Sequence, residues 1–156
     1  MNSAIIVAAG ASRRMGFDKI FAQLHGKPVL YWSMKAFQEC ADIGEIVVVT
    51  RAEKVAEVKR LVAAEKLSKV SAVVEGGAER HLSVWKGLRA VQAEGSQFVA
   101  IHDAARPLIT PKLVSECINL AKKNGAACCA SPIPDTVKRA SDRKSTRLNS
   151  SHQIIS

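Results

Sequence analysis

The sequence has few aromatic residues, and its acidic residues are outnumbered by basic ones. Aromatic side chains make up 4% of the 156 residues, and 14 Asp and Glu stand against 23 Lys and Arg. A formal net charge of +9 is compatible with a nucleic-acid partner. However, so few aromatic side chains provide no stacking platform for single strands. Three of the positive charges also lie in a tail that we predict to be foreign to the fold: Arg143, Lys144 and Arg147. We therefore expect anionic small-molecule substrates and no nucleic acid.

The N-terminal region has no long hydrophobic run, and its longest apolar segment covers residues 4–9. Such a segment is far too short to span a bilayer. No basic stretch precedes it, as one would in a secretory signal. The chain is long enough for one domain with a core and too short for two. We expect a globular domain in the cytoplasm, without membrane contact.

The four cysteines do not have the spacing of a zinc site. Cys128 and Cys129 are adjacent, so on a strand their side chains would point to opposite faces and would not bind one metal together. Cysteine in apolar segments is usually a small core residue, and we expect that role here.

Short apolar runs alternate with amphipathic stretches along the chain. The runs lack polar alternation, which is typical of strands covered by helices on both faces; they are residues 5–8, 46–50, 70–74, 98–102 and 126–130. The amphipathic stretches predict helices at residues 28–41, 53–66, 79–94 and 112–124. Thr110 is the expected cap of the last helix, and Gly125 its end. The alternation predicts an α/β fold with a doubly wound, mostly parallel sheet, in which ligands bind beyond the carboxyl ends of the strands.

The last residues differ in composition from the rest of the chain. From about residue 142 there is no helical or strand period, and Ser, Asn and basic residues are frequent. This segment resembles the translated read-through of sequencing adapters. We predict one domain over residues 1–141, cut near Ser141, and a non-native tail over residues 142–156. A disordered basic tail is the alternative.

The first candidate site follows the first predicted strand. Small residues at positions 8–12 and Gly16 let backbone N–H groups approach phosphate oxygens. Arg13, Arg14 and Lys19 supply the positive charge that a polyphosphate needs. This combination favours a nucleoside triphosphate. The spacing is neither the G-x-G-x-x-G of dinucleotide-binding proteins nor the G-x-x-x-x-G-K-[ST] of the P-loop, so an ordinary strand–turn connection is the alternative at this point.

The second candidate site is the segment from His102 to Arg106, after another predicted strand. A carboxylate directly after a buried strand points into the ligand crevice. Next to phosphates, Asp103 would bind a divalent metal, since Mg²⁺ takes one or two carboxylates plus substrate oxygens. Arg106 is placed to pair with Asp103 or to reach a phosphate, and His102 is expected to orient its neighbours without a catalytic role. A helix-capping Asp103 in a structural salt bridge is the alternative.

Two further loops follow predicted strands. The backbone at Gly76-Gly77 can lie against a flat base, and Ser83 can then hydrogen-bond a base or ribose edge. Alone, this segment also fits an ordinary strand–helix turn. Thr136 and Lys138 would meet the phosphate of a second substrate, unless they belong to a proline-stiffened loop with solvated charges.

Together these motifs resemble those of the 2-C-methyl-D-erythritol 4-phosphate cytidylyltransferase family. The resemblance covers residues 4–139 in order, with motifs at 8–16 (AAGASRRMG), 18–19 (DK), 76–84 (GGAERHLSV), 102–107 (HDAARP) and 135–139 (DTVKR). The first motif is shared by many sugar and cofactor nucleotidyltransferases. The combination of the GGAERHLSV and HDAARP motifs is far narrower.

The resemblance implies a Rossmann-like, three-layer α/β/α nucleotidyltransferase fold. It also implies transfer of a cytidylyl group from CTP to a polyol phosphate, with release of pyrophosphate and without a covalent intermediate. Mg²⁺ would accompany CTP, with Asp103 as its ligand, and the full-length family member would be a homodimer. Arg14 and Lys19 would be catalytic, and Thr136 and Lys138 would bind the polyol phosphate. The nucleotide-binding residues would be Ala8, Ala9, Gly10, Ala11, Ser12, Arg13, Gly76, Gly77, Arg80, Ser83, Asp103, Ala104, Ala105 and Arg106.

Family members continue beyond the end of this sequence, and the part missing here carries an arginine and a lysine that bind the polyol phosphate in the family. We therefore expect this chain to bind CTP weakly and to turn over poorly or not at all. The alternatives are a ribitol-phosphate cytidylyltransferase, a guanylyltransferase of molybdenum cofactor synthesis and a non-catalytic nucleotide-binding fragment. An NAD(P)-binding oxidoreductase domain is disfavoured, because the dinucleotide fingerprint is absent and hydride transfer has no use for Arg14 and Lys19.

Overall fold

The structure, a computed structural model, describes residues 1–10, 17–92 and 95–132. Its centre is a parallel sheet of four strands in the order β5-β4-β1-β6. These strands are β1 (Asn2–Ala8), β4 (Ile43–Thr50), β5 (Val70–Glu75) and β6 (Val99–Asp103). They are rich in Val and Ile, whose branched side chains pack well on the two faces of a buried sheet. A short antiparallel hairpin of β2 (Gln23–Leu24) and β3 (Lys27–Pro28) stands apart from this sheet.

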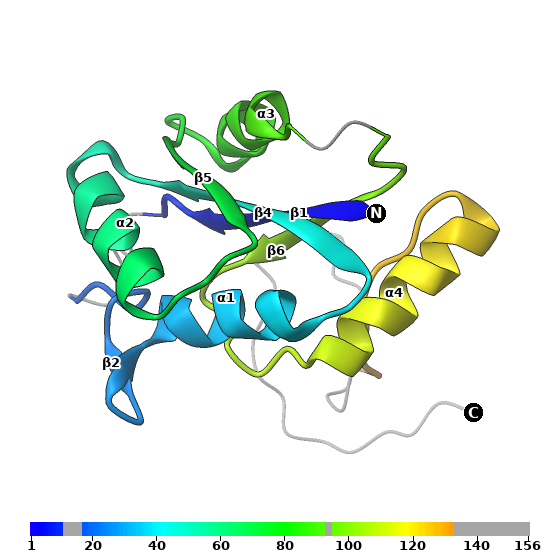
Figure 1. The fold of residues 1–156 in the computed structure, drawn as a ribbon, viewed down its shortest axis with the longest axis horizontal. Coiled ribbons are helices and arrows are strands. Elements are labelled where there is room, and N and C mark those ends of the chain that lie inside the picture. Colours follow the sequence, from blue (N-terminus) through cyan, green and yellow to red (C-terminus); the bar gives the residue numbers. More distant parts are fainter. Residues whose placement is uncertain (11–16, 93–94, 133–156) are drawn as a thin grey trace, which may run out of the picture.

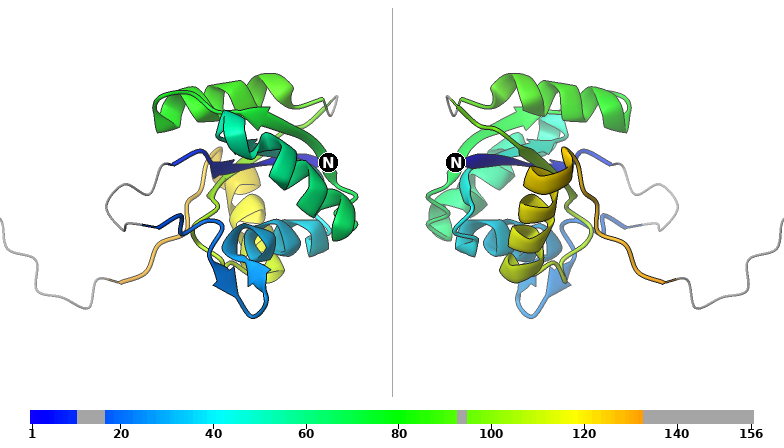
Figure 2. Two further views of the ribbon diagram at one scale, coloured as in Figure 1. Left: turned by 90° about the vertical axis from the view of Figure 1, so that its left-hand side faces the viewer. Right: turned by 90° about the vertical axis from the view of Figure 1, so that its right-hand side faces the viewer.

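Helices cover both faces of the sheet (Figure 1). One face carries α3 (Arg80–Ala90), and the other carries α1 (Val29–Glu39), α2 (Val55–Ala64) and α4 (Pro111–Asn124). The side views in Figure 2 show the sheet between the two helical layers. A 3-10 turn, Ala52–Lys54, leads into α2. The predicted doubly wound, three-layer α/β/α architecture is confirmed.

Alternation of side chains along the strands divides the core into two parts. Ile6 and Val48 belong to the larger cluster under α1, α2 and α4, whereas Ile5 and Val47 belong to the smaller cluster under α3. Helix α3 packs mainly on β1, β4 and β5. Ile101, which pairs with Ile5 in register on β6, is consequently 46% exposed.

The order of the strands reverses beside β1. The chain builds outward from β1 through β4 to β5, and α3 then returns it to β6 on the other side of β1. In open α/β sheets, such a reversal leaves a crevice at the carboxyl ends of the two central strands, and ligands bind there. The residues that follow β1 and β6 therefore flank the crevice that this topology creates.

The strand predicted at residues 126–130 is wrong, and so is the expected burial of two cysteines. Residues 126–130 form no strand, and Cys128 and Cys129 are exposed. An apolar run becomes a strand only where a neighbouring strand takes up its backbone hydrogen bonds. Here the segment does not pair with β6, and the two line a common cavity instead. Cys40 is buried as expected, and Cys117 is intermediate.

The other predicted helices and strands are confirmed, with ends that differ by a few residues. The largest difference is at α3, which ends at Ala90 because Val91 already has an extended backbone. The predicted cap is present at α4, where the hydroxyl of Thr110 accepts a hydrogen bond from the Leu113 amide at 3.2 Å. Gly125 ends α4 with a φ of +85°. Within the described residues, no helix is long and apolar enough to cross a membrane.

Candidate functional site

The four strands of the sheet end at one edge, and the segments that follow them form a rim. In register, Thr50 lies opposite both Ala8 and Glu75, and Asp103 lies opposite Val7. Two backbone hydrogen bonds link the exits: the amide of Ala104 donates to the carbonyl of Val7 at 3.0 Å, and that of Gly76 donates to the carbonyl of Thr50 at 2.8 Å. The rim thus brings together three of the predicted motifs, which follow β1, β5 and β6.

Gly76 touches the exit of β1. A Cβ atom at this position would lie 2.5 Å from the Cβ of Ala9 and 2.8 Å from the Oγ of Ser83. Both distances are well below van der Waals contact, so only glycine fits without a shift of the neighbours. The glycine pair therefore allows the loop after β5 to approach the turn after β1.

Ser83 fixes the loop between β5 and α3. Its side chain is 1% exposed. Its hydroxyl accepts a hydrogen bond from the Gly77 amide at 3.0 Å and lies 3.1 Å from the carbonyl of Glu79, to which it donates. The hydroxyl thus holds Gly77 against the first turn of α3. The contact of Ser83 with a base or ribose stays a prediction.

Asp103, at the end of β6, lies between two arginines. Nε and Nη2 of Arg80 donate to Oδ1 of Asp103 at 3.0 and 2.9 Å, and Nε of Arg106 lies 3.5 Å from Oδ2. The side chains of Arg80 and Arg106 are 60% and 77% exposed. This cluster joins the first residue of α3 to the last residue of β6, and it places two positive charges beside one negative charge on the rim.

His102 supports the loop that follows Asp103. It is buried, its ring lies 5.1 Å from that of Phe37, and its Nε2 is 3.1 Å from the carbonyl oxygen of Arg106. Because a carbonyl only accepts hydrogen bonds, Nε2 carries the proton. Burial lowers the pKa of His102 below its usual 6.5, against the opposing effect of the hydrogen bond to Arg106, so the ring is neutral at pH 7. This geometry fits the predicted role of orienting its neighbours.

Ala104 and Ala105 continue the β6 exit. The side chain of Ala104 is fully buried. Its backbone amide donates a hydrogen bond to the carbonyl of Val7, and its carbonyl accepts one from the Ser33 hydroxyl at 2.9 Å. The hydrogen bonds of Ala104 fix the loop after β6, and the contacts of Ala104 and Ala105 with the nucleotide stay predictions.

Lys19 lies on a turn at the same end of the sheet. The carbonyl of Asp18 accepts hydrogen bonds from the amides of Phe21 and Ala22 at 3.1 and 3.0 Å, and this turn presents Lys19 to solvent. Lys19 forms no ion pair within the part of the chain that is described. Its positive charge is thus available to an anionic ligand.

Six predicted site residues lie outside the described residues. They are Ala11, Ser12, Arg13, Arg14, Thr136 and Lys138. Their predicted roles in binding or catalysis stay predictions.

Arg51 is a rim residue that the sequence motifs did not identify. It follows β4 directly, and its guanidinium group contacts Gly10, Asp18 and Glu53. The Asp18 carboxylate, more than that of Glu53, raises the pKa of Arg51 and keeps it charged. Its place immediately after an apolar run is the same signal that selected Asp103, although no motif surrounds it.

The sequence selected one carboxylate of the rim, Asp103, as a ligand of a divalent metal. Among them, no cluster of three or more His, Cys, Asp and Glu side chains is arranged to hold a metal ion. Asp103 is the rim carboxylate that the sequence selected, and both of its oxygens face guanidinium groups. A Mg²⁺ ion that takes most of its ligands from nucleotide phosphates and water is compatible with a single carboxylate. An ion that binds Oδ1 of Asp103 would have to displace the Arg80 side chain.

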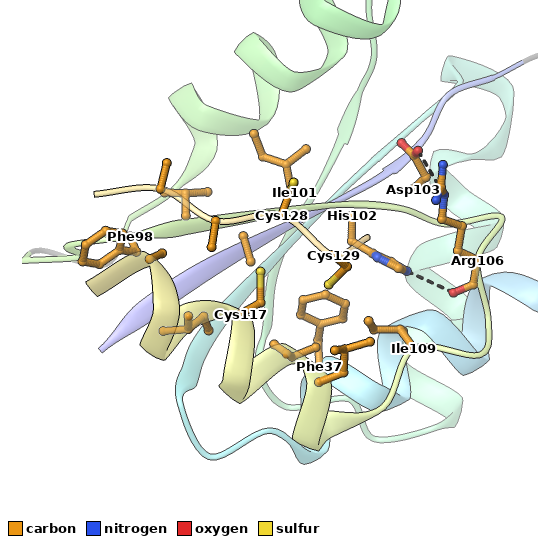
Figure 3. Close-up of a pocket in the computed structure, with 18 of the residues that line it drawn as sticks. Phe37, Phe98, Ile101, His102, Asp103, Arg106, Ile109, Cys117, Cys128 and Cys129 are labelled. Carbon is orange, nitrogen blue, oxygen red and sulfur yellow. Dashed lines mark hydrogen bonds and ion pairs between the residues drawn. The ribbon is translucent and has the colours of Figure 1, made fainter. Parts of the chain in front are cut away.

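A cavity of about 820 Å³ lies beside β6. Asp103 and Arg106 lie at one end, and the rest of the lining is mainly apolar, with Cys117, Cys128 and Cys129 at the centre (Figure 3). Burial raises the pKa of the Cys117 thiol, and the neighbouring Cys129 adds to this effect. A mainly apolar lining does not suit a triphosphate, so we place the candidate nucleotide site at the rim.

A family model matches nearly the whole chain. The model described as IspD, 2-C-methyl-D-erythritol 4-phosphate cytidylyltransferase, matches residues 2–149. The match extends beyond residue 141, and the domain boundary predicted there stays a prediction.

Curated relatives and a solved structure carry related names. The chain is 39% identical over 142 residues to the 2-C-methyl-D-erythritol 4-phosphate cytidylyltransferase of Lachnospira eligens, covering 90% of this chain and 62% of that protein. It is 44% identical over 143 residues to the enzyme of the same name from Alkaliphilus oremlandii, covering 90% and 60%. A crystal structure of 4-diphosphocytidyl-2C-methyl-D-erythritol synthase from Anaerococcus prevotii superposes with a TM-score of 0.67 at 31% identity, covering 79% of this chain and 51% of that one. The chain thus spans about 60% of the length of these curated relatives.

Proposed function

Because the chain belongs to the 2-C-methyl-D-erythritol 4-phosphate cytidylyltransferase family, we propose that it transfers a cytidylyl group from CTP to 2-C-methyl-D-erythritol 4-phosphate. The observation that carries the proposal is the rim. There, the exits of β1, β5 and β6 meet where the strand order reverses. Gly76 contacts Ala9, and the amide of Ala104 donates a hydrogen bond to the carbonyl of Val7. The proposed reaction belongs to the biosynthesis of isoprenoid precursors.

In the proposed reaction, an oxygen of the polyol phosphate attacks the α-phosphorus of CTP. A bond forms between that oxygen and the α-phosphorus, the bond to the β-phosphate oxygen breaks, and pyrophosphate leaves with the electron pair. No covalent enzyme intermediate is needed, so the protein contributes positioning and charge stabilisation. Arg14 and Lys19 would stabilise the negative charge that develops on the α-phosphate.

The remaining rim residues would bind the two substrates. The turn from Ala8 to Arg13 would hold the triphosphate through backbone amides. The Gly76–Ser83 loop would lie against cytosine and ribose, and Arg80 and Arg106 would supply positive charge near the phosphates. Thr136 and Lys138 would contact the polyol phosphate.

A divalent metal supplied with CTP would offset phosphate charge, and Asp103 is the residue that would hold it. We propose that this metal is Mg²⁺, which prefers oxygen ligands and retains several of its waters. We further propose that the full-length protein is a homodimer and acts in the cytoplasm.

Calorimetry with four nucleotides tests the proposal. The chain is titrated with CTP, GTP, UTP and ATP in the presence of Mg²⁺. Pyrophosphate release with CTP and either 2-C-methyl-D-erythritol 4-phosphate or ribitol 5-phosphate is then measured for a protein with the full length of its relatives, because we expect the 156 residues alone to turn over poorly. We expect CTP to bind most tightly and the methylerythritol phosphate to be the better acceptor. A preference for GTP would point to a guanylyltransferase, a preference for ribitol 5-phosphate to the other cytidylyltransferase, and no binding at all would contradict the assignment of the rim.

A further inference from the structure

Arg51 contacts both described ends of the segment that leads from β1 to Lys19. Its Nη1 donates to the carbonyl oxygen of Gly10 at 3.1 Å, and its Nη2 pairs with Oδ2 of Asp18. Its Nε donates to Oε1 of Glu53 at 2.7 Å. The parallel pairing of β1 with β4 makes this possible, because the two strands end side by side. One planar guanidinium group therefore joins the exit of β1 to the turn that presents Lys19.

The position of Asp18 depends on this contact. Within the described residues, Arg51 is the only ion-pair partner of Asp18, and Oδ1 of Asp18 is buried without a hydrogen-bond partner. A partly buried carboxylate that loses its counter-ion is disfavoured. We therefore expect Asp18 to move when Arg51 is removed. The turn that begins at the carbonyl of Asp18 and carries Lys19 would move with it.

Arg51 is not itself placed as a phosphate-binding cation. Asp18 and Glu53 offset its charge, and its side chain is 19% exposed. Lys19 is exposed and forms no ion pair among the described residues, so it differs from Arg51 in both respects. Any effect of Arg51 on a ligand must therefore act through Gly10 and Asp18.

We propose that Arg51 is a positioning residue, which holds the exit of β1 at Gly10 and the turn that carries Lys19 in the arrangement that binds the triphosphate of the nucleotide. This inference rests on the proposed function, because it assumes that the nucleotide binds at the exit of β1. It adds a residue after β4 to the site, where the sequence motifs contributed residues after β1, β5 and β6.

Comparing CTP with CMP tests the proposal, because CMP lacks the β- and γ-phosphates. Dissociation constants for both nucleotides are measured with Mg²⁺ for the wild-type chain, Arg51→Lys and Arg51→Met. We expect both substitutions to weaken the binding of CTP roughly tenfold and that of CMP less than about twofold. Arg51→Lys should act like Arg51→Met, since lysine keeps the charge but lacks the planar group that joins Gly10 to Asp18. A purely structural role would lower the melting temperature without changing the preference for CTP over CMP.

Two controls and a double variant complete the test. Glu53→Gln removes a negative charge next to Arg51, and Arg60→Met removes a positive charge from the exposed face of α2. Both variants should keep the wild-type preference for CTP over CMP. In an Asp18→Asn background, Arg51→Met should weaken CTP less than it does in the wild type, because one of the two partners through which Arg51 acts is already changed. If Arg51→Lys and Arg51→Met both keep the wild-type preference, Arg51 is not a positioning residue, although the proposed function stands. If the wild-type chain does not bind CTP, the proposed function fails and this inference fails with it.

Discussion

Arg80 donates two hydrogen bonds to a single oxygen of Asp103, from Nε at 3.0 Å and from Nη2 at 2.9 Å. The first residue of α3 is thereby attached to the last residue of β6. We propose that Asp103 holds a divalent metal. A metal bound at Oδ1 would compete with Arg80 for this oxygen.

This competition predicts the effect of Arg80→Met. Without the guanidinium group, Oδ1 of Asp103 is free, so the Mn²⁺ concentration that half-saturates CTP binding should fall by roughly threefold or more. Since Arg80 is 60% exposed, the free energy of unfolding should change by less than about 0.5 kcal/mol. Titration of Mn²⁺ at fixed CTP measures the first quantity and urea unfolding the second.

Arg89→Met is the matched control, because it removes the same group from the last turn of α3. It should leave the Mn²⁺ dependence unchanged. An identical Mn²⁺ dependence in the wild type and Arg80→Met would show that Asp103 does not hold the metal.

The close approach of Gly76 to Ala9 predicts a cost for Gly76→Ala. The new Cβ would lie 2.5 Å from the Cβ of Ala9, so the loop after β5 must shift, with a loss of about 1–3 kcal/mol in the free energy of unfolding. A Cβ at Gly10 meets no atom within 4 Å, and Gly10→Ala should change stability by less than about 0.5 kcal/mol. Urea unfolding of the two variants makes the comparison, and equal stabilities would contradict the packing described here.

His102 predicts a dependence of stability on pH. Its pKa is lowered in the folded state from 6.5, so the unfolded chain takes up a proton before the folded chain does. Stability is therefore complete above about pH 7 and falls as the pH drops through 6.5 toward the lower, folded pKa. His102→Gln should flatten this part of a stability profile between about pH 5 and 7, measured by urea unfolding. His81→Gln is the control, since the His81 side chain is 72% exposed. If both substitutions change the stability profile equally, the burial of His102 is not the cause of the pH dependence.

The sequence predicted the strands of the sheet well because each contains a short apolar run. Residues 46–50, for example, are wholly buried in β4. Residues 126–130 form an apolar run of the same kind, but no strand pairs with them, and the pairing partner of a strand is not encoded in its own composition. The β2–β3 hairpin, with two residues in each strand, was too short for a periodic signal.

The candidate site was predictable where a motif followed a strand and was missed where contacts alone define the residue. Asp103 and Gly76 belong to recognisable motifs, and both lie on the rim. The partners of Asp103 and of Arg51 depend on side-chain directions across the sheet, which residue spacing does not give. Ser83 was predicted as a ligand contact, and its buried hydroxyl is also engaged with Gly77 and Glu79.

We propose that Arg14 and Lys19 bind the phosphates of CTP. Calorimetric titration of CTP into Arg14→Met/Lys19→Met tests it most directly, with Lys59→Met/Arg60→Met as a control that removes the same charges from α2. We expect the first double variant to bind CTP roughly a hundredfold more weakly than the wild type, and the control to bind as the wild type does. Equal CTP affinities in the two double variants would contradict the claim.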